Sequence, residues 1–213
     1  MQTPFSNQSA FGTKSSDPRF GLSQYTITRR AMQLVGATIY LYDPHGNLVM
    51  WGKRQAWKIF GDISFFSDET QSQEMIRLVA RQGQGIFAGK RTYDVFDPIA
   101  NTKIGAFQRD NLTSGLVRDT WDILDLEDRV VGQTLEDSTF FSLLRRYVEW
   151  CDMIFPQRFH ATLQGQPVAH YARHRNFFSS RMDLDFSMDA AALLDRRLGL
   201  AMAMLLEVVE TKR

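Results

Sequence analysis

The sequence predicts a mainly β protein with some α structure, in which about twelve strands close into a barrel around a hydrophobic C-terminal helix. Short apolar runs alternate with turn-forming residues over most of the chain. Near the C-terminus, a long segment of helix-forming residues has no polar face. One further segment, residues 138–151, has the spacing of a short amphipathic helix.

Composition sets the outer limits on function. The chain has 213 residues, with 25 Lys and Arg against 24 Asp and Glu, and a single Cys. This length is enough for one domain with a sizeable core. The balanced charge argues against a nucleic-acid binder, and one cysteine excludes an intrachain disulfide framework. Since we find neither a secretory signal nor a run of about 18 apolar residues, we expect no transmembrane span and a cytoplasmic protein, with peripheral membrane attachment left open.

Two regions of the chain differ in composition and in hydrophobic pattern. Residues 1–22 are rich in Ser, Gln, Thr and Asn and show no hydrophobic period. Such a segment is expected to be flexible. From residue 23 onward, apolar runs and turns alternate as far as the C-terminal helix. We therefore predict a flexible N-terminal segment, 1–22, and one barrel domain, 23–213.

Four segments follow a plan of strand, tight turn and strand. Their turns centre on Asp43-Pro44, Asp97-Pro98, Asp125 and Gly165. Proline fixes φ, the Asp side chain bonds nearby backbone, and glycine permits positive φ. We interpret the three Asp residues as turn formers rather than catalytic carboxylates. Further strands are expected in the ranges 24–29, 57–66, 74–82 and 176–186.

The segment Ser138–Cys151 places apolar side chains on one helical face. We expect this helix to pack on the barrel surface or to close one barrel end. A membrane-surface helix would need a stronger cationic face than Arg145 and Arg146 provide. Cys151 lies on the apolar face and is interpreted as a small buried hydrophobe.

The C-terminal helix is the most informative segment. We expect it to begin near Asp189, and it is apolar at nine consecutive positions from Leu198 to Leu206. A helix that is apolar on all sides must be enclosed on all sides, and a barrel of about twelve strands is wide enough to hold it. The residues predicted to fill the core are Leu198, Leu200, Met202, Met204, Leu205 and Leu206.

This plan resembles the Tubby C-terminal-like superfamily, which includes phospholipid scramblases and LURP-one-related proteins. Residues 93–98, Tyr-Asp-Val-Phe-Asp-Pro, with Ile104-Gly105 and Arg109 after them, look like the hairpin unit of that family. Residues 182–188, Met-Asp-Leu-Asp-Phe-Ser-Met, are similar to the segment that leads into the family's C-terminal helix. The resemblance covers residues 25–210 and implies the same barrel.

The departures from that family concern activity. Scramblases have a calcium-binding segment of acidic residues that ends at the position matching Asp183. Here the earlier ligand positions fall on Ala172 and His174 within a basic stretch, which supplies few of the oxygen ligands that calcium needs. A proline-rich tail and a cysteine cluster are also absent from the sequence. The resemblance therefore implies a soluble protein of this fold that binds a lipid headgroup or a partner protein.

Catalytic signals are weak. We find no nucleophile elbow, phosphate-binding loop or zinc-protease motif, so the sequence indicates no catalytic residue and no cofactor while leaving enzymatic activity open. His160, His170 and His174 lie on one predicted hairpin, but a convincing metal site needs a full ligand set. We interpret these histidines as incidental and expect no metal site.

A cationic patch is the stronger candidate for a binding site. Arg173, His174, Arg175 and Arg181 lie close together in sequence, near the aromatic pair Phe177-Phe178. Such a patch can hold a phosphorylated headgroup, although a solvated strand face gives the same pattern. The sequence predicts a non-enzymatic, peripheral binder of anionic phospholipids.

Two other functions stay open. The first is a protein-interaction module that docks through residues 1–20 or through the helix at 138–151, without lipid binding. The second, a small-molecule pocket at a barrel mouth, is disfavoured because the helix fills the lumen. The oligomeric state is undetermined.

Overall fold

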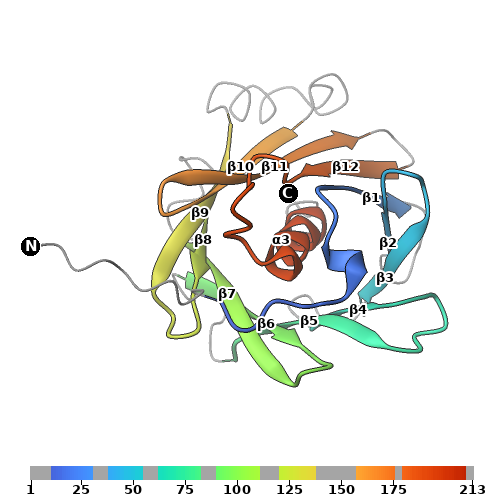
Figure 1. Ribbon diagram of the computed structural model, residues 1–213, viewed down its shortest axis with the longest axis horizontal. Coiled ribbons are helices and arrows are strands. Elements are labelled where there is room, and N and C mark those ends of the chain that lie inside the picture. Colours follow the sequence, from blue (N-terminus) through green and yellow to red (C-terminus); the bar gives the residue numbers. More distant parts are fainter. Residues whose placement is uncertain are drawn as a thin grey trace, which may run out of the picture.

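The computed structural model describes residues 11–30, 38–54, 62–82, 90–110, 120–137, 157–175 and 179–209. Within these ranges, the chain forms twelve strands, a short 3-10 helix and the helix α3 (Figure 1). The strands are β1 (Gln24–Arg30), β2 (Thr38–Tyr42), β3 (Leu48–Arg54), β4 (Ile63–Phe66), β5 (Glu74–Ala80), β6 (Lys90–Asp97), β7 (Thr102–Asp110), β8 (Thr120–Leu124), β9 (Val130–Glu136), β10 (Gln157–Leu163), β11 (Gln166–Arg175) and β12 (Ser179–Asp185). The helices are η1 (Pro18–Phe20) and α3 (Arg196–Val209).

The strands form a closed antiparallel barrel. Each strand pairs with the next in sequence, and β1 closes the sheet by pairing with β12, where Ile27 lies opposite Met182. Closure leaves no free sheet edge in the wall. The predicted β-barrel is therefore confirmed, and α3 lies at its centre (Figure 1).

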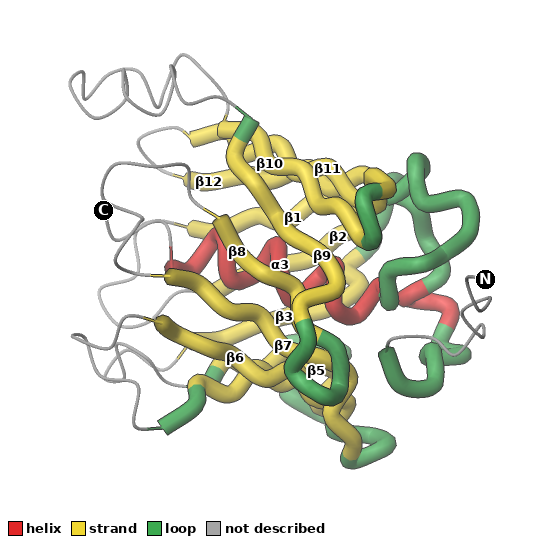
Figure 2. The backbone as a smooth tube through the Cα atoms, turned by 90° about the vertical axis from the view of Figure 1, so that its left-hand side faces the viewer, coloured by secondary structure: helices red, strands yellow, loops and turns green. Residues whose placement is uncertain are grey.

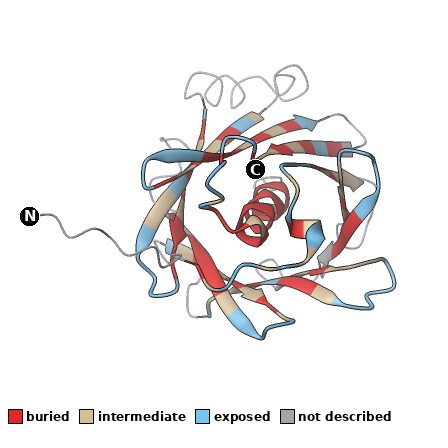
Figure 3. Cartoon of the chain, in the orientation of Figure 1, coloured by how far each residue is buried: buried red, intermediate tan, exposed pale blue. Residues whose placement is uncertain are grey.

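Alternation along each strand decides which side chains face the lumen. In β2, Ile39 and Leu41 are 1% and 0% exposed, whereas Tyr40 and Tyr42 are partly exposed. This is the two-residue period of a half-buried strand. Figure 3 shows buried residues interspersed with exposed and intermediate ones along the strands that surround α3.

The turn-forming role predicted for three aspartates is confirmed. The Asp43 carboxylate accepts hydrogen bonds from the backbone N–H groups of His45 and Asn47, both at 2.8 Å. Asp97 accepts from Ile99 and Ala100, at 2.8 and 3.0 Å. In the third turn, the carboxylate of residue 125 accepts in the same way from the N–H groups of residues 127 and 129. Each side chain thus satisfies backbone donors that its turn would leave unpaired.

The helix begins later than the sequence predicts. Residues 189–195 are not helical, because the Asp189 carboxylate accepts from the N–H groups of Leu193 and Leu194 and Ala192 adopts a positive φ of 49°. Asp195 then caps α3 by accepting from the Arg197 N–H at 2.9 Å. The segment 189–195 is therefore a capped turn, and α3 itself is about 21 Å long.

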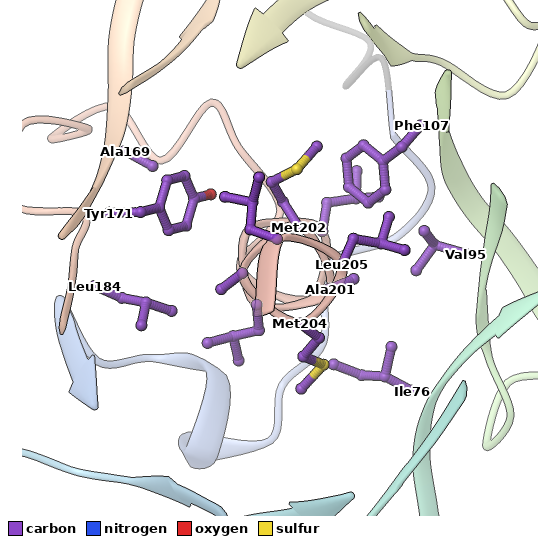
Figure 4. Close-up of a cluster of buried hydrophobic side chains, with 14 of the residues drawn as sticks. Ile76, Val95, Phe107, Ala169, Tyr171, Leu184, Ala201, Met202, Met204 and Leu205 are labelled. Carbon is purple, nitrogen blue, oxygen red and sulfur yellow. The ribbon is translucent and has the colours of Figure 1, made fainter. Parts of the chain in front are cut away.

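The whole described apolar run of α3 is enclosed. The residues from Leu198 to Val208 are all buried, and the six side chains predicted to fill the core are at most 1% exposed. Wall side chains surround the helix (Figure 4), among them Ile76, Val95, Phe107, Ala169, Tyr171 and Leu184. Small residues allow this approach: a Cβ on Gly105 would lie 3.1 Å from Leu198, and one on Gly199 would overlap the Phe186 ring.

A buried arginine anchors the start of α3. The Arg197 guanidinium is 2% exposed and pairs with the carboxylates of Asp195 and Asp97, and it donates to the Thr13 carbonyl at 2.7 Å. Burial alone would lower the pKa of Arg197, but hydrogen bonds and charge from the two aspartates raise it above its ordinary value. The helix start, the hairpin between β6 and β7, and the N-terminal segment therefore meet at one side chain.

Part of the segment expected to be flexible is packed. Phe11 and Phe20 are 3% and 6% exposed and belong to the core, and the Tyr25 hydroxyl donates to the Arg19 carbonyl at 2.9 Å. Figure 1 shows this segment crossing the barrel mouth beside α3. The aromatic residues spaced through a polar stretch are the signal for this packing. The domain boundary after residue 22 stays a prediction.

Two other expectations concern the amphipathic helix and the absence of a transmembrane span. The predicted helix at 138–151, with Cys151, and residues 1–10 lie outside the described ranges. Neither helix of the described part has the length and apolar character needed to cross a membrane.

An ion-pair network lies on the outer wall. Arg81 donates to both carboxylate oxygens of Asp94, at 2.8 and 2.7 Å, and to Asp128 at 2.6 Å. Lys103 pairs with Asp128 at 2.8 Å. Hydrogen bonds from Arg81 and Lys103 lower the pKa of Asp128 to about 2.

Removing α3 should abolish cooperative folding. Each buried Leu, Met or Val contributes roughly 2 kcal/mol, and eight such side chains lie after Asp189. Together they contribute about 16 kcal/mol, which exceeds a typical net stability of about 5–15 kcal/mol. A chain truncated after Asp189 should show no sigmoidal transition in thermal unfolding followed by circular dichroism. A truncated chain that melts like the full-length protein would contradict the enclosed helix.

In the variant Asp128→Asn, the free energy of unfolding should fall less between pH 5 and pH 2 than it does in the wild type. The folded-state pKa of Asp128, about 2, lies below the ordinary 3.8, so its contribution is complete above pH about 4 and is lost as the pH falls toward 2. Asn tolerates the positive φ of this position, 64°. Urea unfolding should show a gap between wild type and variant at pH 5 that narrows toward pH 2. A gap independent of pH would exclude this role.

Candidate functional site

The four residues of the predicted cationic patch do not share one face. Arg173 in β11 points into the lumen and is 1% exposed, whereas His174 and Arg181 are exposed on the outer wall. Adjacent residues in a strand face opposite sides of a sheet, so Arg173 is separated from the other two. Arg175 ends β11, and its side chain lies outside the described residues.

On the outer wall, His174 and Arg181 are cross-strand partners. The Arg181 Nε donates to Asp183 at 2.9 Å, and the His174 Nε2 lies 3.6 Å from the same carboxylate. Thr26 also donates to Asp183, at 3.0 Å. The pair is accessible to a ligand, with 60% of the Arg181 side chain exposed, but Asp183 offsets part of its positive charge.

Inside the barrel, Arg173 holds the end of α3. Its Nη1 donates to Gln157 Oε1 at 2.8 Å, its Nη2 donates to the Leu206 carbonyl, and its guanidinium lies 5.8 Å from the centre of the Phe159 ring. A cation at a helix C-terminus is favourable because it meets the negative end of the helix dipole. Arg173 is therefore placed as a structural anchor.

Glu207 completes this anchor. The carboxylate is fully buried and lies 3.1 Å from Arg29 Nε and 3.2 Å from Arg173 Nε. A buried charge is tolerated only when it is paired. Sequence reasoning missed the pairing of Glu207 with Arg29, which lies at the other end of the chain. The signal that was available is a single acidic residue in the apolar part of the helix that begins at Leu198.

The same end of the barrel carries a concentration of basic residues. We define the basic rim as the last two residues of each strand at the end where α3 terminates; Figure 2 shows the start and end of α3 at opposite ends of the barrel. Nine rim positions are Lys or Arg, and two, Asp110 and Glu136, are acidic. The basic positions are Arg29, Arg30, Lys53, Arg54, Lys90, Arg91, Arg109, Arg158 and Arg175.

The opposite strand ends have the reverse composition. There Lys103 is the one basic position among the described strand ends, against Glu74, Asp97 and Asp185. Charge is therefore divided along the barrel axis, although the whole chain has a formal net charge of only +1. Sequence reasoning missed this division because residues far apart in sequence meet at one end only after the barrel closes.

The rim has inner and outer members. Arg29 and Arg109 belong to the interior, and the Arg109 guanidinium lies 5.5 Å from the centre of the Trp121 ring. Lys90 and Arg158 are exposed and accessible to a ligand. The inner arginines hold the end of α3 and its wall, whereas the outer cations face solvent.

The histidines considered for metal binding lie on the outer wall. His160 and His170 are cross-strand partners; the first bonds to the Asp137 carboxylate, and the second lies 3.8 Å from it. Among the described side chains, no group of three or more His, Cys, Asp and Glu residues is arranged to hold a metal ion.

Comparisons with known proteins add little. No family model matches the chain, and no curated protein matches it. The X-ray structure of a protein from Arabidopsis thaliana is similar, with a TM-score of 0.46 and 12% sequence identity over 92% of this chain and 97% of the other. At that level, the similarity assigns neither a family nor a function to the chain.

The variant Glu207→Gln should destabilise the fold by about 3 kcal/mol, because it leaves the buried Arg173 and the partly buried Arg29 without this counter-charge. Urea unfolding at neutral pH measures this loss. The matched control, Glu127→Gln, removes an acid whose side chain is 63% exposed and should change stability by less than about 0.5 kcal/mol. Equal stability of the two variants would contradict the anchoring role of Glu207.

Proposed function

We propose that this chain is a scramblase-like member of the Tubby C-terminal-like superfamily that binds anionic phospholipid headgroups at the membrane surface without catalysing a reaction. The family assignment is supported by the order of the sequence motifs and by the strand-enclosed C-terminal helix. The proposed ligand class is supported by the charges at the barrel end.

The observation that carries this proposal is the basic rim. Each Lys or Arg held near an anionic membrane surface contributes about 1 kcal/mol to binding. The exposed members Lys90 and Arg158 therefore provide attraction that the opposite end of the barrel lacks. His174 and Arg181 add further positive charge on the adjoining wall, reduced by Asp183.

The filled lumen favours binding at the outer surface. Met202, Leu205 and their neighbours on α3 occupy the centre of the barrel, in contact with wall side chains such as Phe107 (Figure 4). A ligand entering this space would have to displace core side chains, at a cost comparable to the stability of the fold. We therefore place the headgroup at the rim.

Calcium is not included in the proposal. Of the positions that match the calcium-binding segment of scramblases, Asp183 is held by Thr26 and Arg181, and the earlier positions are Ala172 and His174. An alanine and a histidine cannot provide the oxygen ligands that calcium prefers.

Vesicle flotation tests this function. The full-length protein should float with phosphatidylcholine vesicles that contain phosphatidylserine and not with phosphatidylcholine alone, and binding should weaken as salt rises. The double variant Lys90→Gln/Arg158→Gln should bind about 30-fold more weakly, since two surface charges are lost. The control Arg77→Gln/Arg129→Gln makes the same change in net charge away from the rim and should bind nearly as well as wild type.

Two outcomes would contradict this function. Wild type that fails to float at low salt would exclude lipid binding, and equal losses in the two double variants would exclude the rim as the site. In the first case, the interaction module becomes the better hypothesis. A pull-down that loses its partner when residues 1–10 are deleted would support that hypothesis. The deletion should stop at residue 10, because removing residues 1–20 would also take Phe11 and Phe20 out of the core.

A further inference from the structure

Three of the four histidines of the chain lie on the outer face of two neighbouring strands, β10 and β11 (Figure 1). Strand register places His160 of β10 beside His170 of β11, and His174 lies four residues further along β11, on the same face. Their side chains are 39%, 35% and 52% exposed. We call this part of the outer wall the histidine wall; its titratable and charged residues are Asp137, Arg158, His160, His170, His174, Arg181, Asp183 and Asp185.

Two of these histidines share a carboxylate. The His160 ring bonds to the Asp137 carboxylate, which follows β9, and His170 Nε2 lies 3.8 Å from the same group. From the other side, β12 places Asp185 opposite His170. The β9 residue opposite His160 is the uncharged Leu135. Each ring therefore has a carboxylate beside it that can pair with the protonated form.

The third histidine lies closer to the basic rim. His174 is the cross-strand partner of Arg181 in β12 and lies 3.6 Å from Asp183. On β10, the exposed Arg158 lies two residues from His160, on the same face. The described outward residues between and beside these groups carry no charge; they are Ala172 on β11 and Gln24, Thr26 and Thr28 on β1.

The net charge of the histidine wall depends on its histidines. With neutral rings, its two arginines and three aspartates give a net charge of −1, and protonation of the three rings changes this to +2. The ordinary titration of histidine falls between pH 5 and 8, whereas Arg and Asp ordinarily keep their charges throughout that range. Acid therefore converts a surface that weakly repels anions into one that attracts them.

Two of the three rings lie close enough to the rim to act with it. His174 is one residue from the end of β11, and His160 is three residues from the start of β10. These separations are about 3 and 10 Å along the strands, comparable to the Debye length of about 8–10 Å. His170 is five residues from the rim, or about 17 Å. Arg158 belongs to both the basic rim and the histidine wall, so the two surfaces are continuous.

We propose that the histidine wall is an anion-binding extension of the basic rim that becomes cationic in acid, so that the protein binds anionic bilayers more tightly near pH 5 than near pH 7.5. This inference rests on the proposed function and adds a pH control to the same site. At neutral pH, the aspartates offset the charge of Arg158 and Arg181; protonated His160 and His174 offset the aspartates in turn and leave the arginines free to attract lipid phosphates.

The test uses full-length protein and phosphatidylcholine vesicles containing phosphatidylglycerol, whose phosphodiester carries the same charge at both pH values. In flotation, wild type should bind about 30-fold more tightly at pH 5 than at pH 7.5, because two further charges lie near the surface. The variant His160→Gln/His170→Gln/His174→Gln should bind with one affinity at both pH values. The matched control, His45→Gln, removes the fourth histidine, in the turn between β2 and β3 at the opposite end of the barrel, and should keep the full response.

Thermal unfolding at both pH values checks that each protein is folded. If the triple variant does not fold, the variant His160→Gln/His174→Gln should still lose most of the pH response, because the remaining His170 lies farther from the rim.

The outcomes separate this inference from the proposed function. If wild type binds equally well at both pH values, the histidine wall takes no part and the headgroup function stands. If the variants without wall histidines keep the same response as wild type, the titrating groups lie elsewhere and the inference is overturned. If wild type binds at neither pH value, the proposed function fails and the inference fails with it.

Discussion

A helix without a polar face has to be surrounded, and this requirement organises the molecule. From Leu198 to Val208 every residue of α3 is buried, which a single neighbouring element could not achieve. A closed wall of twelve strands achieves it and leaves no sheet edge exposed. Most inward positions of the strands are consequently apolar, and the inward residues Arg29, Arg109 and Arg173 lie toward the end of the barrel where α3 terminates.

Charged side chains set the position of this helix along the barrel axis. At its start, Arg197 joins Asp195, Asp97 and the Thr13 carbonyl; at its end, Glu207 lies between Arg29 and Arg173. Apolar contacts alone would allow the helix to slide or rotate, because they are non-directional. A displaced helix would leave these buried charges unpaired, at several kcal/mol each. The arginines at the second end therefore serve the fold, and it is the exposed cations beside them that can serve binding.

The fold was accessible from sequence because its signals are local. Strand alternation, the Asp turns and the apolar run at Leu198–Leu206 each lie within a short window, and together they leave few architectures that satisfy them. The helix start was placed too early because the Asp189 carboxylate bonds backbone N–H groups without helix formation, and both arrangements use an Asp at that position.

The candidate site was less accessible because it is assembled from distant strands. Arg173 and Arg181 are near in sequence, yet the wall separates them, whereas Arg29 and Glu207 meet from opposite ends of the chain. The basic rim likewise exists only once twelve strands are in register. Spacing within one segment predicts which residues share a strand face; it does not predict which side of the wall that face occupies until the neighbouring strands are known.

Hydrogen exchange of the α3 amides measures the central constraint directly. If the helix is the enclosed core, its amides from Leu200 to Val208 should exchange only through global unfolding, with the same free energy of opening as the most protected wall strands. Exchange of these amides through a cheaper local opening, while the wall strands stay protected, would show that the barrel does not depend on the helix and would contradict the account.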